Sequence, residues 1–227
     1  MALLGKAVMM NWSNVAPIHR PDYYSWHNRE HIAGRLAIPG FRRGRRMRAI
    51  DADRDFFNLY EVDSLAVLTG PDYSAKAGNP SPETKRTGTM IKDAIRALAH
   101  VRYSDGMGQG GVMLTARFAL DDDAAAAPMI AELMPLFAGL PDIVGAHLCV
   151  ADTAASTVIT ADRRGRPTTV PHWAIIIEAT TREGLERARS DYLHPAATAR
   201  FGFAAPPVFG FYGLQLLMSK ADLDAPR

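Results

Sequence analysis

The order of extended and helical segments, which occurs twice along the chain, is the feature that most restricts the fold. In the first half, a strand-like apolar run at 6–15 precedes a helical run at 21–38 and then two extended runs separated by a turn. A second helical region beginning at Ser64 and a strand near 101–106 complete this half. The same order recurs over 112–219. Two βαββαβ units predict an α+β fold made of two tandem ferredoxin-like repeats.

Local signals set the expected limits of the elements. Pro21 suits the first turn of a helix, and Pro39 with Gly40 ends that helix. After Ser64 we expect a loop over 77–87 and a return to helix over 88–100. The remaining expected elements are strands at 41–50, 55–63, 112–120, 143–151, 172–180 and 210–219, and helices at 124–140 and 182–193.

The glycine-rich segment DGMGQGG separates the two units. The residues that follow it alternate as a strand, so they supply no helix amino terminus to a phosphate group, and a phosphate-binding loop is disfavoured. We therefore divide the chain into a first repeat at 1–105, a linker at 106–111 and a second repeat at 112–220.

Composition is that of a soluble globular protein, with 48% apolar residues among 227. The single cysteine, Cys149, excludes an intramolecular disulfide, and neither a signal peptide nor a membrane-length apolar run is visible, so a cytoplasmic location is expected. The net charge of +2 favours neither nucleic acid nor a membrane as partner. The arginines of FRRGRRMR fit either a solvated strand face or a clamp for an anionic substrate.

A four-stranded sheet with helices on one side leaves its other face to be covered. We expect the sheets of the two repeats to pack face to face, with helices outside. The barrel-like interior between the sheets is then the expected place for a mostly apolar pocket.

The stretch DYYSWHNREH gathers the candidate chemistry. At 100° per residue, Tyr23, His27 and His31 share one helix face with Glu30, while the apolar residues of the same helix lie opposite. Histidine exchanges protons near neutral pH, and Glu30 could orient an imidazole, so a general acid or base is expected here. The alternatives are that both histidines only pack, or that they chelate a metal. A third metal ligand is not visible, so no metal is expected.

Four further residues are candidate substrate contacts. Asn11 and Trp12 lie on opposite faces of the first strand, so only one of them can face the interior. Arg45 and Tyr60, on the central hairpin, could supply a cation and a phenol to the same cavity. The helix at 124–140 has no histidine, so any chemistry is assigned to the first repeat, with the second as its structural partner.

Three segments of the first repeat, WHNREHIAGRLAIPGF, RRGRRM and LYEVDSLAVL, resemble the EthD-like branch of the dimeric α+β barrel superfamily. In that branch a helix carrying Glu-His leads through a Pro-Gly-Phe turn into the second strand, which favours His31. The segment DYLHPAA is similar to the His-Pro element of stress-responsive barrel proteins, without their usual second histidine. The resemblance implies a two-sheet barrel built within one chain. It also implies activities that range from cofactor-independent oxygenation of aromatics to isomerisation, decarboxylation and, in distant relatives, haem chemistry.

These observations predict a cofactor-independent enzyme acting on an aromatic or polyketide-like carbonyl compound by proton transfer, decarboxylation or oxygenation. The expected catalytic residues are His31, His27 and Tyr23. Two alternatives remain open: a non-catalytic barrel that binds a hydrophobic ligand, and one that binds haem. Because exposed sheet edges often pair, a homodimer is also expected.

Overall fold

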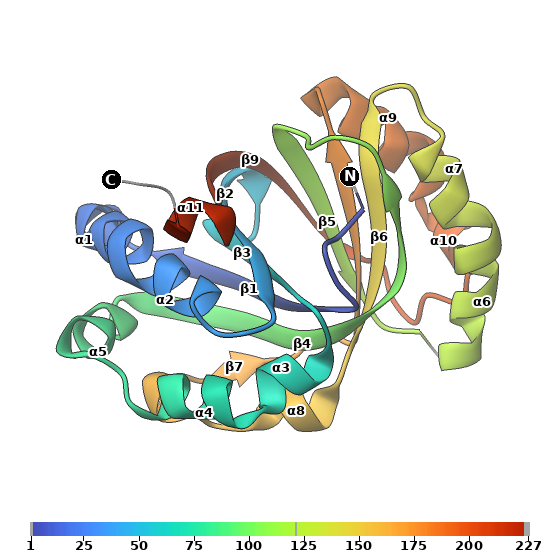
Figure 1. Cartoon of the computed structure of the whole chain (residues 1–227). Coiled ribbons are helices and arrows are strands. Elements are labelled where there is room, and N and C mark those ends of the chain that lie inside the picture. The colour runs from blue at the N-terminus through green and yellow to red at the C-terminus, as the bar shows by residue number, and fades with distance from the viewer. Residues whose placement is uncertain (1, 121, 225–227) are drawn as a thin grey trace.

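The computed structural model describes residues 2–120 and 122–224, in which the βαββαβ order occurs twice (Figure 1). The first repeat contains β1 (Ala7–Val15), η1 (Pro17–His19), α1 (Arg20–Trp26), η2 (His27–His31), α2 (Ile32–Leu36), β2 (Phe41–Ala52), β3 (Phe56–Val62), α3 (Leu65–Thr69), α4 (Pro71–Gly78), α5 (Pro82–Gly88) and β4 (Ile91–Gly106).

The second repeat follows a short connection at 107–111. It contains β5 (Val112–Phe118), η3 (Asp123–Ala125), α6 (Ala126–Pro128), η4 (Met129–Leu133), α7 (Met134–Ala138), β6 (Ile143–Ala151), α8 (Thr153–Thr157), η5 (Ala161–Arg163), β7 (Thr168–Thr169), β8 (Trp173–Ala179), α9 (Arg182–Tyr192), α10 (Pro195–Arg200), β9 (Val208–Ser219) and α11 (Ala221–Asp224). Among the described residues, no helix has the length and apolarity needed to cross a membrane.

Eight strands form a closed antiparallel barrel in the order β1-β3-β2-β9-β5-β8-β6-β4, and β4 pairs with β1 to complete it. The sheets of the two repeats join through the β2–β9 and β4–β6 pairs. The predicted α+β fold, with helices outside the barrel, is confirmed (Figure 1). Because the barrel closes within one chain, the sheet edges that suggested a homodimer are paired with each other. The homodimer stays a prediction.

The helix expected over 88–100 is wrong, because this segment forms most of β4, a strand of 16 residues. Ile95, Ala97 and Ala99 point into the barrel, whereas Arg96 and Leu98 point to the helix layer. Both faces of β4 are covered and the sequence is rich in alanine, so the two-residue alternation of a strand was hidden.

Side chains fill the barrel interior, so the prediction of a pocket between the two sheets is wrong. The interior cluster contains Met10, Trp12 and Phe57 from the first repeat and Met113 and Ile176 from the second, all at most 1% exposed. The Trp12 ring stacks on Phe57, with 4.7 Å between centroids, and its Nε1 donates to Thr115 Oγ1 at 3.2 Å. The two sheets therefore pack as one core.

A chain of buried ion pairs crosses the same interior. Arg45 donates to Glu61 at 3.0 Å and lies 2.7 Å from the Glu178 carboxylate of the second repeat. Arg43 also pairs with Glu61, at 2.7 Å, and His147 lies 3.2 Å from Glu178. Neither a solvated strand face nor a substrate clamp describes Arg43 and Arg45, because their partners are carboxylates inside the barrel.

The helical layer over the first sheet contains a wide π turn at His27–His31, in which Ile32 N donates to His27 O. The second repeat has the same turn at Met129–Leu133. The extra residue in the wide turn brings His27 and Ile32 to the same side of the helix, against the sheet. In a regular helix at 100° per residue, the two side chains would lie on different faces. The helix also lies close to β2, because a Cβ at Gly44 would come 2.7 Å from Ile32.

Candidate functional site

A cavity of about 90 Å³ lies between the helical layer and the outer face of the first repeat's sheet. Its walls come from β1, β3 and β4 on the sheet side and from α1, η2, α2, α4 and α5 on the helix side. The cavity is thus separated from the barrel interior by the sheet itself. Tyr23, His27, His31, Asn11 and Tyr60 all line it.

His27 is buried, and both of its ring nitrogens have partners. Arg46 Nη1 lies 3.3 Å from Nδ1, and because guanidinium can only donate, Nδ1 is the acceptor. The neutral ring then carries its proton on Nε2, which donates to Tyr60 Oη at 3.1 Å. Burial, together with the Arg46 charge, lowers the pKa of His27 to about 3, so the ring stays neutral. His27 therefore orients Tyr60 and leaves the phenol hydrogen of Tyr60 available.

His31 is half-buried beside the cavity, and no hydrogen bond joins its ring to another residue of the described chain. Its imidazole packs on Trp26 with 4.2 Å between ring centroids, and its centroid is 6.2 Å from that of Tyr60. Burial, followed by the Arg35 charge, holds the pKa of His31 well below its usual value. A neutral imidazole without a protein partner is free to accept a proton from a ligand.

Tyr23 and Asn58 form a second polar pair in the cavity. Asn58 Nδ2 donates to Tyr23 Oη at 3.1 Å, and burial raises the pKa of Tyr23 to about 12. Tyr23 is therefore a neutral hydroxyl donor. Asn58 Oδ1 is buried without a hydrogen-bond partner among the described residues, so it is available to a donor group on a ligand.

Three sequence expectations about the site differ from the structure. Arg45 lies on the barrel side of the sheet, paired with Glu61 and Glu178, so the sheet separates it from the imidazoles. The Trp12 ring also points into the barrel, so of these two β1 candidates it is Asn11 whose side chain faces the cavity. Glu30 accepts from the hydroxyls of Ser81 and Thr84, so its carboxylate holds α5 instead of orienting an imidazole.

Five charged residues that line the cavity were not among those predicted from the sequence. Arg35 extends from α2 and Arg96 from β4, whereas Asp162, Arg163 and Arg166 belong to the segment between β6 and β8 of the second repeat. This segment reaches across to the first repeat because β7 pairs with β4, with Ala94 opposite Thr168. The second repeat therefore builds part of the site, a role that its sequence gave no separate signal for.

A wider groove of about 520 Å³ adjoins the cavity and shares Gly88, Ile91, Ala94, Asp162 and Arg166 with it. The groove runs between the end of α5, the start of β4 and the loop around η5. Together the two spaces have the size of an ordinary small-molecule site, with the narrow end at the histidines.

Metal ligation has no support within the described ranges, where no three side chains of His, Cys, Asp or Glu converge. The two imidazoles instead lie among neutral hydroxyls and guanidinium groups. Such a site can take a proton from a ligand and stabilise the negative charge that results.

Several solved structures have a similar architecture. The chain is similar to an anthrone oxidase-like protein (TM-score 0.66, 12% identity, covering 97% of this chain and 96% of that one). It is also similar to a candidate monooxygenase of Fusobacterium nucleatum (TM-score 0.60, 10% identity, 96% of each chain) and to one of Lactobacillus acidophilus (0.57, 10%, 95% and 97%). The chain has the dimeric α+β barrel fold. No family model and no curated protein matches its sequence.

In this dimeric α+β barrel, both halves come from one chain, as the resemblance of the sequence implied. The EthD-like branch rests on the motifs of the first repeat alone. At such low identity the comparisons establish the fold and leave the reaction to the residues of the site.

Proposed function

We propose that the protein is a small-molecule enzyme that removes a proton from a carbon next to the carbonyl group of an aromatic or polyketide-like compound, with His31 as the base. One observation carries the proposal: the His31 ring has no hydrogen-bond partner in the described structure and borders a cavity that also contains the Tyr60 hydroxyl. His27 assists by holding Tyr60, which donates to the carbonyl oxygen. Tyr23 and Asn11 contact the substrate.

The charges around His31 support proton removal. A lowered pKa makes an imidazole a weaker base, but the arginines that lower it also stabilise the enolate that forms. The enolate carries a full negative charge, whereas the ground-state carbonyl is neutral. The arginines therefore stabilise the negative charge that proton transfer creates and that the ground state lacks.

The deprotonated carbon offers a path to oxygenation, which the names of the anthrone oxidase-like and monooxygenase-like neighbours support. The carbanion would give one electron to dioxygen, and the two radicals would join in a carbon–oxygen bond. Protonation gives a hydroperoxide, and loss of water from it leaves a new carbonyl. The substrate carbon supplies all four electrons that reduce dioxygen to the new carbonyl oxygen and water, so the reaction requires only dioxygen.

The size of the site supports a substrate bound with one end inward. The 90 Å³ cavity holds only the reacting edge of an aromatic ring system, and the 520 Å³ groove holds the remainder. The groove adjoins the cavity that His31 lines, so the inserted end of the substrate would lie beside the imidazole.

Anthrone is a suitable probe because the CH₂ group between its rings is acidic. In D₂O without oxygen, the wild-type protein should accelerate exchange of these hydrogens, followed by NMR, and in air it should consume oxygen. His31→Gln should lose both activities. His100→Gln, a change at an exposed histidine of β4, should retain them.

Equal exchange rates in wild type and His31→Gln would contradict the proposed base. Tight binding of anthrone without exchange would instead support a non-catalytic ligand-binding barrel. A haem absorption band that forms on titration and is lost in His31→Gln would support the haem alternative.

A further inference from the structure

The charged groups around the cavity are strongly unbalanced. Four guanidinium groups line it, and Asp162 is its one carboxylate among the described residues. The imidazoles of His27 and His31 are neutral, so they do not change the balance. The site therefore has a net charge of about +3 at neutral pH.

Arg35 has unused hydrogen-bonding capacity in this cluster. It is 5% exposed, and its Nη2 donates to Asp162 at 2.7 Å. Its Nε and Nη1 are buried without a hydrogen-bond partner among the described residues. A buried guanidinium with two unused nitrogens costs free energy unless a ligand supplies acceptor oxygens.

The same cluster makes the Tyr73 hydroxyl more acidic than usual. Arg96 Nη2 donates to the Tyr73 hydroxyl at 3.0 Å, and the Arg35 guanidinium lies 4.8 Å from the centre of the Tyr73 ring. Burial raises the pKa of Tyr73, but the charges of Arg35 and Arg96 outweigh it and the net shift is downward. An acidic group placed here therefore favours its ionised form.

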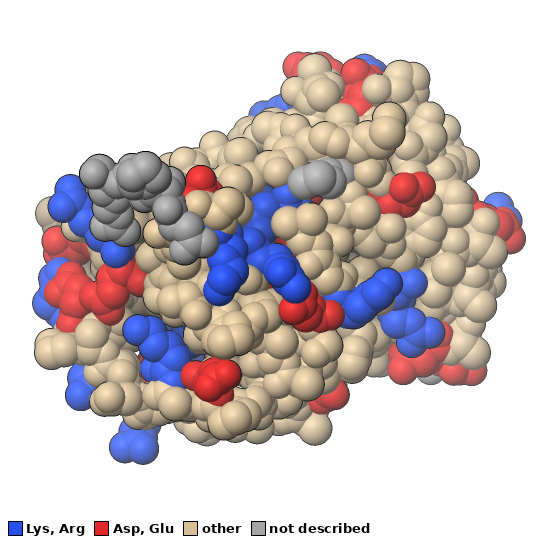
Figure 2. All heavy atoms as spheres, in the orientation of Figure 1, with Lys and Arg blue, Asp and Glu red and all other residues tan. Residues whose placement is uncertain are grey.

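The two remaining arginines come from the segment that covers the groove. Burial and the nearby Arg96 charge lower the pKa of Arg163 to about 10, which shows that like charges are crowded here. Arg166 is half-buried and lines both the cavity and the groove. Figure 2 shows basic side chains gathered beside one acidic group on the surface between α2, α4 and α5.

We propose that Arg35, Arg96, Arg163 and Arg166 form a binding site for a carboxylate group of the substrate, and that Asp162 occupies this site when substrate is absent. The inference rests on the proposed function for the identity of the cavity as the active site, and it adds the chemical class: an aromatic or polyketide-like carbonyl compound that carries an acid. Arginine forks suit such a group because they bind both of its oxygens at once.

A matched pair of probes tests the site without turnover. We expect 1-naphthoate to bind at least tenfold more tightly than the neutral 1-naphthamide of similar shape, measured by isothermal titration calorimetry. Arg35→Met and Arg166→Met should each remove this preference while the amide binds as before. The control Arg182→Met, on the exposed helix α9, should keep the wild-type preference.

The variant Arg166→Met is included as a check on folding. Arg166 lies in the segment between β6 and β8 and not in a helix or strand of the barrel, so its replacement should leave the fold intact. Equal affinity of acid and amide for the wild type would overturn the proposal, as would a preference that survives in both variants. His31→Gln should still prefer the acid. A loss of turnover in that variant without loss of acid binding separates the anion site from the proposed base.

Discussion

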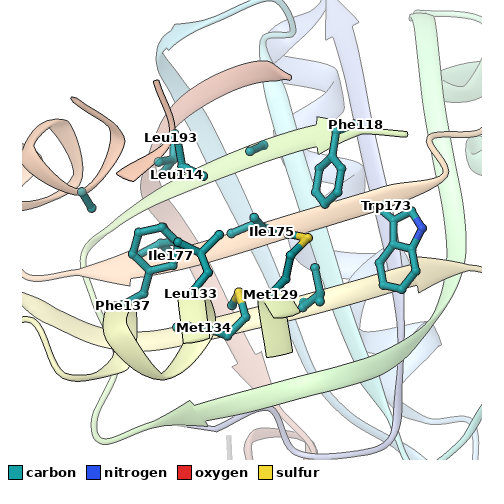
Figure 3. Close-up of a cluster of buried hydrophobic side chains, with 14 of the residues drawn as sticks. Leu114, Phe118, Met129, Leu133, Met134, Phe137, Trp173, Ile175, Ile177 and Leu193 are labelled. Atoms are coloured by element: carbon teal, nitrogen blue, oxygen red, sulfur yellow. The ribbon is translucent and has the colours of Figure 1, made fainter. Parts of the chain in front are cut away.

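The layer between helix and sheet is hollow and polar in the first repeat and solid and apolar in the second. In the second repeat, Phe137, Trp173, Ile175 and Ile177 belong to one buried cluster that fills this layer (Figure 3). Both layers are built on the same frame, because each has a π turn over its sheet, and Glu61 and Glu178 occupy equivalent places in the strand register. The difference therefore lies in the side chains.

The register and the π turns match eight polar residues of the cavity with eight nonpolar residues of the second layer. The matched pairs are Asn11 with Ala116, Tyr23 with Ala125, His27 with Met129, His31 with Leu133, Arg35 with Phe137, Asn58 with Ile175, Tyr60 with Ile177 and Arg96 with Phe209. A wide turn alone is thus a feature of the fold. The polar residues of the first layer mark the site. Burying them lowers stability, and the second repeat builds the same layer from nonpolar residues without that loss.

Replacing His31 with its counterpart leucine should have the largest effect. We expect turnover of anthrone to fall by about 10²-fold or more, the usual loss when a general base is removed. The melting temperature should stay the same or rise, because an unpartnered polar ring is replaced by an apolar side chain. Steady-state rates and thermal melting measured on one preparation check both parts, and a stable variant with full activity would contradict the comparison.

The reverse change tests the second layer. Leu133→His would bury an imidazole among apolar side chains that offer it no partner, and it should lower the free energy of unfolding by about 2–4 kcal/mol. Urea unfolding followed by circular dichroism measures the change. Leu133→Met, which keeps the volume and the apolar character, should cost less than about 1.5 kcal/mol. Equal losses of unfolding free energy in the two variants would show that side-chain volume, and not polarity, determines the stability of this layer.

Acid should weaken the protein through its buried neutral histidines. The pKa values of His27, His31 and His147 are lowered, mainly by burial, so below pH 6.5 the unfolded chain binds protons that the folded chain does not. Stability is therefore fully present above pH 6.5 and falls below it, by about 1.4 kcal/mol per pH unit for each histidine.

Urea unfolding between pH 7.5 and 5 measures this slope. His27→Met, which introduces the residue found in the second repeat, should reduce the slope by about one proton. Met129→Leu, a change within the apolar layer, should leave it unaltered. A slope that does not change in His27→Met would mean that His27 is protonated in the folded protein.

The smallest expected effect concerns Asp162. Asp162→Asn removes the carboxylate that competes for Arg35, so 1-naphthoate should bind several-fold more tightly while 1-naphthamide is unaffected. Calorimetry with both probes checks this. Weaker binding of the acid would mean that Asp162 positions the arginines instead of competing with the ligand.

Much of the fold could be predicted from the sequence because strand alternation and proline positions are local signals. The strand expected at 6–15 corresponds to β1, and that at 143–151 to β6. The strand β4 was missed because both of its faces are covered. The side of the sheet on which the site lies was also missed, since alternation separates Asn11 from Trp12 without telling which faces the barrel.

The arginine cluster was beyond sequence analysis for a different reason. Arg35 and Asp162 are far apart in the chain, and they meet because β7 adds to β4 across the boundary between repeats. No periodicity within either repeat encodes that pairing. The arginines of β2 drew attention instead, and two of them, Arg43 and Arg45, pair with Glu61 and Glu178 inside the barrel.

Closure of the barrel has a consequence for synthesis of the protein. The strand β2 (Phe41–Ala52) pairs with β9 (Val208–Ser219). During synthesis, the backbone hydrogen-bonding groups on this edge of β2 therefore have no partner strand until β9 has left the ribosome. Such distant pairing is slow, and an open edge invites contact with other nascent chains. Synthesis of β9 is thus the event that completes both the barrel and the sheet beneath the cavity.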